Sequence, residues 1–91
     1  MGTTMQLAKH VKFREEKFGG VLFETRSEKV FTLNATAAAV VREIAAGHDQ
    51  KEIAVLLANR FSGPAAAIER EVAGLIEDLQ QKGLVEESSR G

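Results

Sequence analysis

The sequence predicts an α+β fold, in which a three-stranded antiparallel sheet is followed by a three-helix cluster. Residues 11–33 contain short runs of β-branched and aromatic residues separated by turn residues, which is typical of strands. From residue 35 to residue 81, apolar residues recur every three or four positions, which is typical of amphipathic helices. The chain has 91 residues and is 44% hydrophobic, so it can build one hydrophobic core.

Three segments in the first third of the chain have the composition of strands. Residues 11–14 alternate apolar and polar side chains, and residues 21–25 and 29–33 are rich in Val, Phe and Thr. Residues 26–28 suit a short hairpin connection between the last two segments. The glycines at 19–20 allow positive φ in the turn before the second segment. We expect residues 29–33 to form an edge of the sheet, since this segment leads directly into the helices.

Capping residues mark the first two helices. Asn34 is a favourable N-cap residue for a helix over residues 35–46, and Gly47 is a suitable C′ residue to end it. Asp49, with Glu52 three residues later, has the pattern of a capping box and opens a second helix.

A third helix is predicted after the break at residues 62–64, because Pro is tolerated in the first turn of a helix. It runs to about Gln81, and Gly83 ends it. Four apolar residues at helical spacing form its expected core stripe: Ile68, Val72, Leu75 and Leu79. The last two helices have the spacing of a helix-turn-helix, so the fold is expected to be winged-helix-turn-helix-like.

The two ends of the chain are expected to be disordered, over residues 1–8 and 87–91, and residues 9–86 to form one domain. The N-terminus has no hydrophobic signal region, and no apolar run reaches the roughly 18 residues of a membrane span. We therefore expect a cytoplasmic protein that does not enter a membrane. The chain contains no Cys, which excludes disulfides and thiolate metal sites.

The charge distribution argues against a nucleic-acid partner. The net charge is −1, and the predicted third helix is acidic. It carries Glu69, Glu71, Glu77 and Asp78 against Arg70 and Lys82. A recognition helix instead reads base edges and phosphates with basic or amide side chains. A winged-helix DNA-binding transcriptional regulator is therefore kept only as the alternative function.

No group of residues has the pattern of a catalytic or metal site. His10 and His48 are the only histidines, and neither has a second ligand at metal-binding spacing. Glu77 and Asp78 are adjacent carboxylates, but neighbours on a helix point about 100° apart and do not converge. We therefore expect no enzymatic activity, no bound metal and no cofactor.

Three stretches resemble the PqqD family. Residues 30–38, Val-Phe-Thr-Leu-Asn-Ala-Thr-Ala-Ala, resemble its strand-to-helix junction, where Leu-Asn-x-Thr-Ala opens the first helix. Residues 48–53, His-Asp-Gln-Lys-Glu-Ile, resemble the start of its second helix. Residues 72–79, followed by Lys-Gly-Leu-Val at 82–85, resemble its last helix and the Lys-Gly-Leu ending. The resemblance covers about residues 9–86.

The resemblance implies a peptide chaperone of ribosomal peptide modification. Members of this family bind the leader region of a precursor peptide and present it to a modifying enzyme, often a radical S-adenosylmethionine enzyme. The implied partners are therefore a precursor peptide and a radical S-adenosylmethionine or other peptide-modifying enzyme. The resemblance also implies that the peptide adds as a strand beside the third β-strand, in a groove walled by the third helix. A homodimer is a further expectation, because a small fold with an exposed edge can exchange strands or helices.

The candidate binding residues lie on the predicted edge strand and on the third helix. An edge strand offers unpaired N–H and C=O groups to an extended peptide. The strand part of the site comprises Lys29, Val30, Phe31, Thr32 and Leu33. Phe31 and Leu33 share the more apolar face, which is the better candidate for the core face.

On the third helix, Glu69, Ala73 and Ile76 share one flank of the core stripe. Ile76 beside small alanines would form a shallow apolar shoulder, on which an apolar side chain of the peptide could rest. The alternative is that Ile76 only widens the core stripe.

Overall fold

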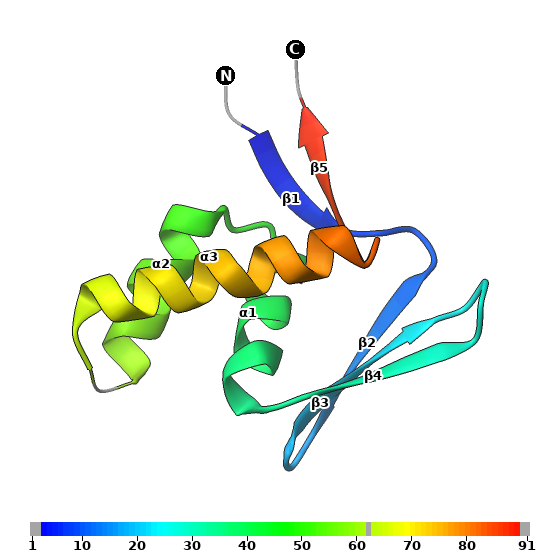
Figure 1. Ribbon diagram of the computed structural model, residues 1–91, viewed down its shortest axis with the longest axis horizontal. Helices are drawn as coiled ribbons and strands as arrows, with labels where there is room; N and C mark the ends of the chain where they lie inside the picture. The colour runs from blue at the N-terminus through cyan, green and yellow to red at the C-terminus, as the bar shows by residue number, and fades with distance from the viewer. Residues whose placement is uncertain (1–2, 62, 90–91) are drawn as a thin grey trace.

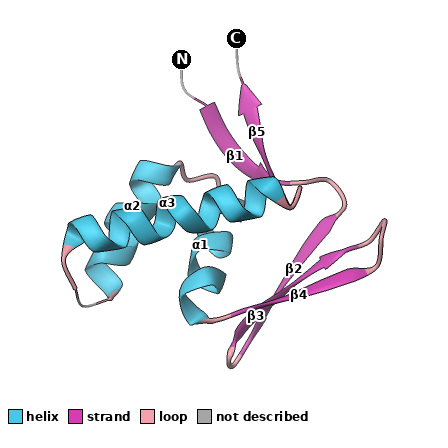
Figure 2. Cartoon of the chain, in the orientation of Figure 1, coloured by secondary structure: helices cyan, strands magenta, loops and turns pink. Residues whose placement is uncertain are grey.

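The computed structural model describes residues 3–61 and 63–89, and these residues form three helices and five strands. The elements are β1 (Thr3–Leu7), β2 (Val11–Glu16), β3 (Gly19–Glu24), β4 (Lys29–Leu33), α1 (Ala35–Ala45), α2 (Gln50–Arg60), α3 (Ala65–Gln81) and β5 (Val85–Ser89). Strands β2 to β4 form one layer beside the helices, and β1 and β5 form a separate ribbon where both chain ends emerge (Figures 1 and 2). The predicted α+β fold, a three-stranded antiparallel sheet followed by three helices, is confirmed.

The three-stranded sheet is an antiparallel meander in the order β2-β3-β4. Its register aligns Glu24 with Lys29 at one end of the β3–β4 pair and Gly20 with Leu33 at the other. Strand β4 is therefore at an edge, as the sequence predicts. It leads through one residue, Asn34, into α1.

The two chain ends correct a prediction. Residues 3–7 and 85–89 form the antiparallel strands β1 and β5, so the expected disorder of residues 1–8 and 87–91 is wrong for residues 3–7 and 87–89. Residues 1–2 and 90–91 lie outside the described residues. Met5 is only 6% exposed and Val85 3%, so apolar burial against the core holds the ribbon in place.

The caps of α1 and α2 are confirmed. The Asn34 side chain accepts a hydrogen bond from the Ala37 N–H at 2.8 Å. Asp49 accepts from the Glu52 N–H at 2.8 Å, and the Glu52 carboxylate accepts from the Asp49 N–H at 2.9 Å, which completes a capping box. None of the helices in the described ranges is long and apolar enough to cross a membrane.

The core stripe of α3 is rotated relative to the prediction. Its buried residues are Ile68, Val72, Ile76 and Leu79. Leu75, expected in the stripe, is only partly buried at its border. Ile76 is 2% exposed, so the alternative that this residue widens the core is the correct one.

Two adjacent glycines fit the sheet against α1. Gly19 has φ +149°, and a Cβ at this position would collide with the carbonyl oxygen of Leu33 at the β4–α1 junction. A Cβ on Gly20 would lie 2.7 Å from Cε1 of Phe13 and 3.3 Å from the Ala38 Cβ. Only residues without a side chain let the turn approach this closely, so the glycines fix where β4 runs.

Candidate functional site

Strand β4 has one free edge. It pairs with β3 on one side, and no strand within residues 3–61 and 63–89 pairs with its other side. Such an edge presents N–H and C=O groups that have no ladder partner. The groups that face outward follow from the register.

The register shows that Val30 and Thr32 direct their backbone groups to the free edge. Just beyond the Val11–Glu24 end of the β2–β3 register, the Thr25 N–H donates to the His10 carbonyl at 2.8 Å, which makes these two residues a hydrogen-bonded pair that continues the ladder. Hydrogen-bonded and non-hydrogen-bonded pairs alternate along an antiparallel ladder, so the even-numbered residues of β3 bond toward β4. Their partners there are Lys29, Phe31 and Leu33. The two residues between these partners therefore offer their N–H and C=O groups outward.

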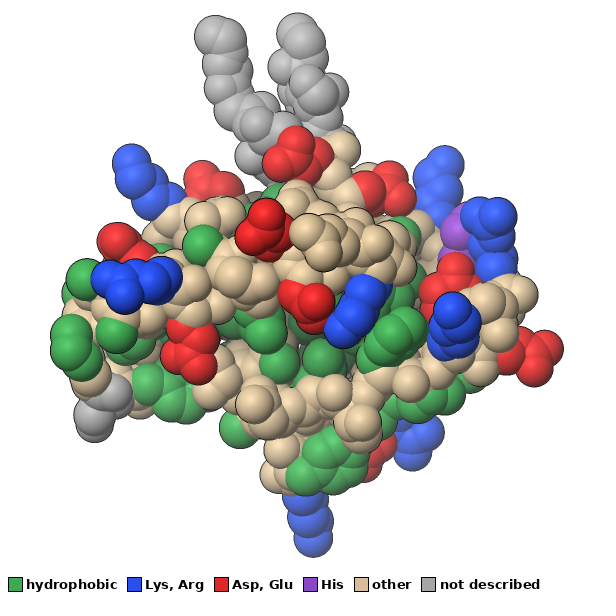
Figure 3. Space-filling view, viewed as in Figure 1, with side chains coloured by type: hydrophobic (Ala, Val, Ile, Leu, Met, Phe, Trp, Pro, Cys, Tyr) green, Lys and Arg blue, Asp and Glu red, His purple; other side chains and the backbone are tan. Residues whose placement is uncertain are grey.

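A groove of about 440 Å³ runs beside this edge, between β4, the start of α1 and the C-terminal half of α3. It is lined by Val30, Phe31, Thr32, Leu33, Asn34, Ala37, Leu75, Asp78, Leu79, Lys82 and Leu84. Hydrophobic side chains are visible in the hollow between α3 and the sheet in Figure 3. The site thus combines free backbone hydrogen-bonding groups with an apolar wall.

The two faces of β4 differ in burial. Leu33 is 7% exposed and Phe31 packs against the core, so the face predicted to be the core face is the core face. Val30 is 60% exposed, and Thr32 is also exposed. A side chain on a strand added beside β4 would therefore meet either the groove or the outer face of the sheet.

One ion pair borders the groove. Lys82 Nζ lies 2.9 Å from Asp78 Oδ2 and 5.9 Å from the centre of the Phe31 ring. The side chains of Lys82 and Asp78 are 47% and 54% exposed, so the pair contributes little to folding stability and is free to exchange partners.

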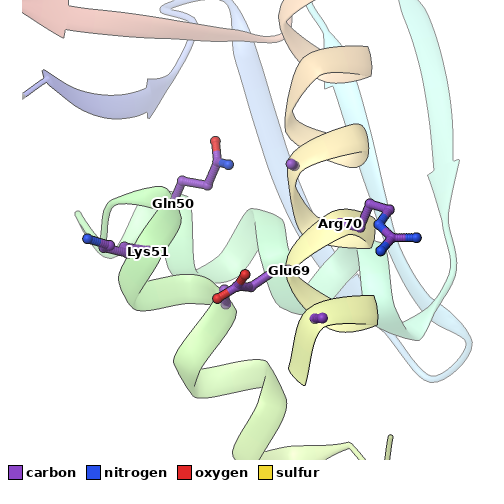
Figure 4. Close-up of a pocket in the computed structure, with 7 residues that line it drawn as sticks. Gln50, Lys51, Glu69 and Arg70 are labelled. Atoms are coloured by element: carbon purple, nitrogen blue, oxygen red, sulfur yellow. The ribbon is translucent and has the colours of Figure 1, made fainter. Parts of the chain in front are cut away.

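The three residues predicted on the third helix do not lie beside β4. Glu69 and Ala73 line a separate hollow of about 610 Å³ between α2 and α3, and Ile76 is buried in the core. In Figure 4 the labelled side chains around this hollow are Gln50 and Lys51 from α2, and Glu69 and Arg70 from α3. The predicted helical wall of the groove is therefore wrong.

The wall is instead the opposite flank of α3, with Leu75, Asp78, Leu79 and Lys82. Helical angles divide α3 into a core stripe and two flanks, but they do not tell which flank faces the sheet. That choice depends on how α3 crosses the sheet in three dimensions. Leu75 was the residue in the sequence that could have indicated the correct flank, since it lies at the border between the apolar stripe and the flank that contains Asp78.

The β3–β4 turn positions the start of β4. The Ser27 N–H donates to Glu24 Oε1 at 2.8 Å, and this hydrogen bond to the charged carboxylate lowers the pKa of Glu24. Glu28 takes a left-handed conformation with φ +61° just before the strand. The bonded carboxylate and this residue together define the entry into β4.

The surface of α3 is acidic. Over Ala65–Gln81 the helix carries a single basic residue, Arg70, and four exposed acidic residues: Glu69, Glu71, Glu77 and Asp78. A negative helix repels the phosphates of duplex DNA. In the part of the chain that the structure describes, no three His, Cys, Asp or Glu side chains are grouped to hold a metal ion.

Comparison with known proteins gives one family and three related structures. The family model PqqD, coenzyme PQQ synthesis protein D, matches residues 19–85. The solved structure of lasso peptide synthetase B1 complexed with the leader peptide is 27% identical, with a TM-score of 0.81; the match covers 90% of this chain and 96% of that one. The search of curated proteins gave no significant match.

Two further structures share the fold. TbiB1 in complex with the TbiA(beta) leader peptide is 19% identical, with a TM-score of 0.84 over 93% of this chain and 99% of that one. The PqqD truncation of PqqCD from Methylobacterium extorquens, described as a stand-alone recognition element for ribosomally synthesized and post-translationally modified peptides, is 24% identical. Its TM-score is 0.72, with 90% of this chain and 87% of that one covered.

Proposed function

This chain belongs to the PqqD family, as its sequence predicts, and we propose that it is a non-catalytic chaperone for the leader region of a ribosomally made precursor peptide. In this role it holds the leader as an added strand and presents the rest of the peptide to a separate modifying enzyme. The relative with 27% identity, which is complexed with a leader peptide, supports the assignment.

The observation that carries the proposal is the free edge of β4 beside an apolar groove. Val30 and Thr32 offer backbone donors and acceptors, which give affinity for any extended peptide. Selectivity has to come from side chains. Every second residue of the added strand faces the groove, where Phe31, Leu75 and Leu79 supply apolar surface.

The modifying enzyme is the second proposed partner. The family resemblance points to a radical S-adenosylmethionine enzyme, whereas the relative at 27% identity is a lasso peptide synthetase component. We propose the radical enzyme as the partner, and a pull-down with purified enzymes of both classes tests the choice. We also propose that the protein is cytoplasmic and that it can form a homodimer by exchanging strands or helices.

The alternative function, a winged-helix DNA-binding regulator, conflicts with the charge of α3. A recognition helix gains most of its affinity from basic side chains at phosphates. Here exposed carboxylates outnumber the basic residue of α3 by four to one. A mobility-shift titration is expected to show no sequence-dependent duplex binding at physiological salt.

The direct test uses the backbone of Thr32. Thr32→Pro removes an N–H that faces the free edge, and Pro is tolerated on an edge strand where that N–H points away from the sheet. Thr32→Ala is the matched control, since it keeps the N–H and loses only the exposed side chain. The measurement is a titration of labelled backbone amides with synthetic leader peptides of candidate precursors.

We expect the amides of β4 and of the C-terminal half of α3 to shift in the native protein. One lost hydrogen bond is worth about 0.5–1.5 kcal/mol, so Thr32→Pro should bind roughly two- to thirteenfold more weakly than Thr32→Ala. Shifts confined to α2 and β2, with β4 silent, would place the peptide elsewhere and refute strand addition.

A further inference from the structure

We propose a second binding subsite on the outer face of the sheet, formed by Val30 and Phe23, that takes a β-branched or aromatic side chain of the bound strand. This inference rests on the proposed addition of a peptide to β4. It concerns the face of that peptide that points away from the groove.

The outer face carries an uncovered apolar pair. Phe23 is 39% exposed and Val30 is 60% exposed, and the register sets them directly opposite each other on β3 and β4. Lys12 of β2 is opposite Phe23 on its other side. The three side chains form one cross-strand row, which ends at the free edge with the exposed Val30.

A strand added beside β4 extends this row by one residue. Directly opposed residues of paired strands place their side chains on the same face. The peptide residue opposite Val30 therefore points to the outer face, next to a valine that has apolar surface to cover. This residue points away from the side chains of Phe31 and Leu33, which lie on the core face of β4, so its apolar neighbour is Val30 and not the helical wall of the groove.

The apolar side chains of Phe23 and Val30 determine which class of peptide side chain binds opposite Val30. Cross-strand pairs of aromatic and β-branched residues stabilise a sheet more than pairs with Ala or polar residues. Val, Ile, Phe or Tyr opposite Val30 would continue the Phe23–Val30 contact. The neighbouring peptide residues point into the apolar groove, so the bound segment should contain apolar residues on both faces and read as a consecutive apolar run.

The test uses a display library of ten-residue peptides selected on the native protein, on Val30→Glu and on Val55→Glu. Val55 is the matched control, because it is 59% exposed like Val30 but lies on α2, outside the groove. Binders are assigned by amide shifts at β4. Intermolecular nuclear Overhauser effects from the side chain of residue 30 identify the opposed peptide position, from the methyl groups of Val30 in the native protein and Val55→Glu and from the methylene groups of Glu in Val30→Glu.

We expect the native protein and Val55→Glu to enrich β-branched and aromatic residues at that position, and Val30→Glu to enrich Lys and Arg there. A fixed native binder should lose about two- to fivefold in affinity with Val30→Thr. Peptides that shift β4 but show no preference opposite Val30, or the same preference on Val30→Glu, would overturn the subsite and leave the proposed function intact. A library that yields no binder at β4 would overturn both.

Discussion

Leu75 offers the clearest test of where the peptide lies. This residue of α3 is partly buried and lines the groove beside β4, outside the fully buried core. Leu75→Ala shortens a side chain that a bound peptide would cover. If the peptide covers one to two of its carbon atoms, the loss is about 0.8–1.6 kcal/mol, or roughly four- to fourteenfold in Kd.

The matched control is Ala73→Arg, two residues away on the same helix. Ala73 faces the hollow between α2 and α3, on the other side from β4. Ala73 is half-buried and outside the core, so a long charged side chain can extend from there to solvent. It should change the Kd for the leader peptide by less than about twofold, since substitutions away from the core and from the binding surface are usually small in effect. Fluorescence anisotropy with a labelled leader peptide measures both constants, and circular dichroism checks that each variant is folded.

The opposite pattern would refute the assignment of the groove. If Ala73→Arg abolishes binding and Leu75→Ala leaves it unchanged, the peptide occupies the hollow between α2 and α3. The flank with Glu69 and Ala73 would then be the binding surface, and the free edge of β4 would not be used.

Three further predictions concern the scaffold. Gly19→Ala should destabilise the fold by about 1–3 kcal/mol in thermal unfolding, because φ +149° is strained for Ala and its Cβ collides with the Leu33 carbonyl. An unchanged melting temperature would contradict that contact. Gly74→Ala should stabilise it by about 0.5–1 kcal/mol, because a helical Cβ there meets nothing within 4 Å. The lowered pKa of Glu24 means that its bond to Ser27 stabilises the turn above pH 4.5, and this contribution is lost as the pH falls through the lowered value. Carboxyl carbon NMR should show Glu24 titrating below 4.5, and Ser27→Pro, which removes the donor, should bring it back toward that value.

Local chemistry explains why most elements could be predicted from the sequence. The caps at Asn34 and Asp49 depend only on residues within one turn of the helix, so their pattern is visible in the sequence. The strand pattern of residues 29–33 and the direct entry into α1 likewise identified β4 as an edge. Each of these features needs no knowledge of the distant parts of the chain.

Features that depend on distant residues could not be predicted in this way. Strand β1 is only five residues long, and its partner β5 begins at Val85, at the other end of the chain. Neither segment is a convincing strand by itself, because a short strand becomes stable only when it pairs and buries a residue such as Met5. The prediction of which α3 residues line the groove was wrong for a related reason. The flank of α3 that faces the sheet is decided by tertiary packing.

Along β4, residues that stabilise the fold alternate with residues that are available for binding. The backbone groups that bond to β3 belong to Lys29, Phe31 and Leu33. The side chains of Phe31 and Leu33 pack toward the core. Changes at these positions would weaken the sheet and the site together, so a loss of binding there says little about the peptide. Val30 and Thr32 direct their backbone groups to the free edge and their side chains to solvent. Because they contribute little to the core, substitutions at these two residues report on peptide binding with the fold intact.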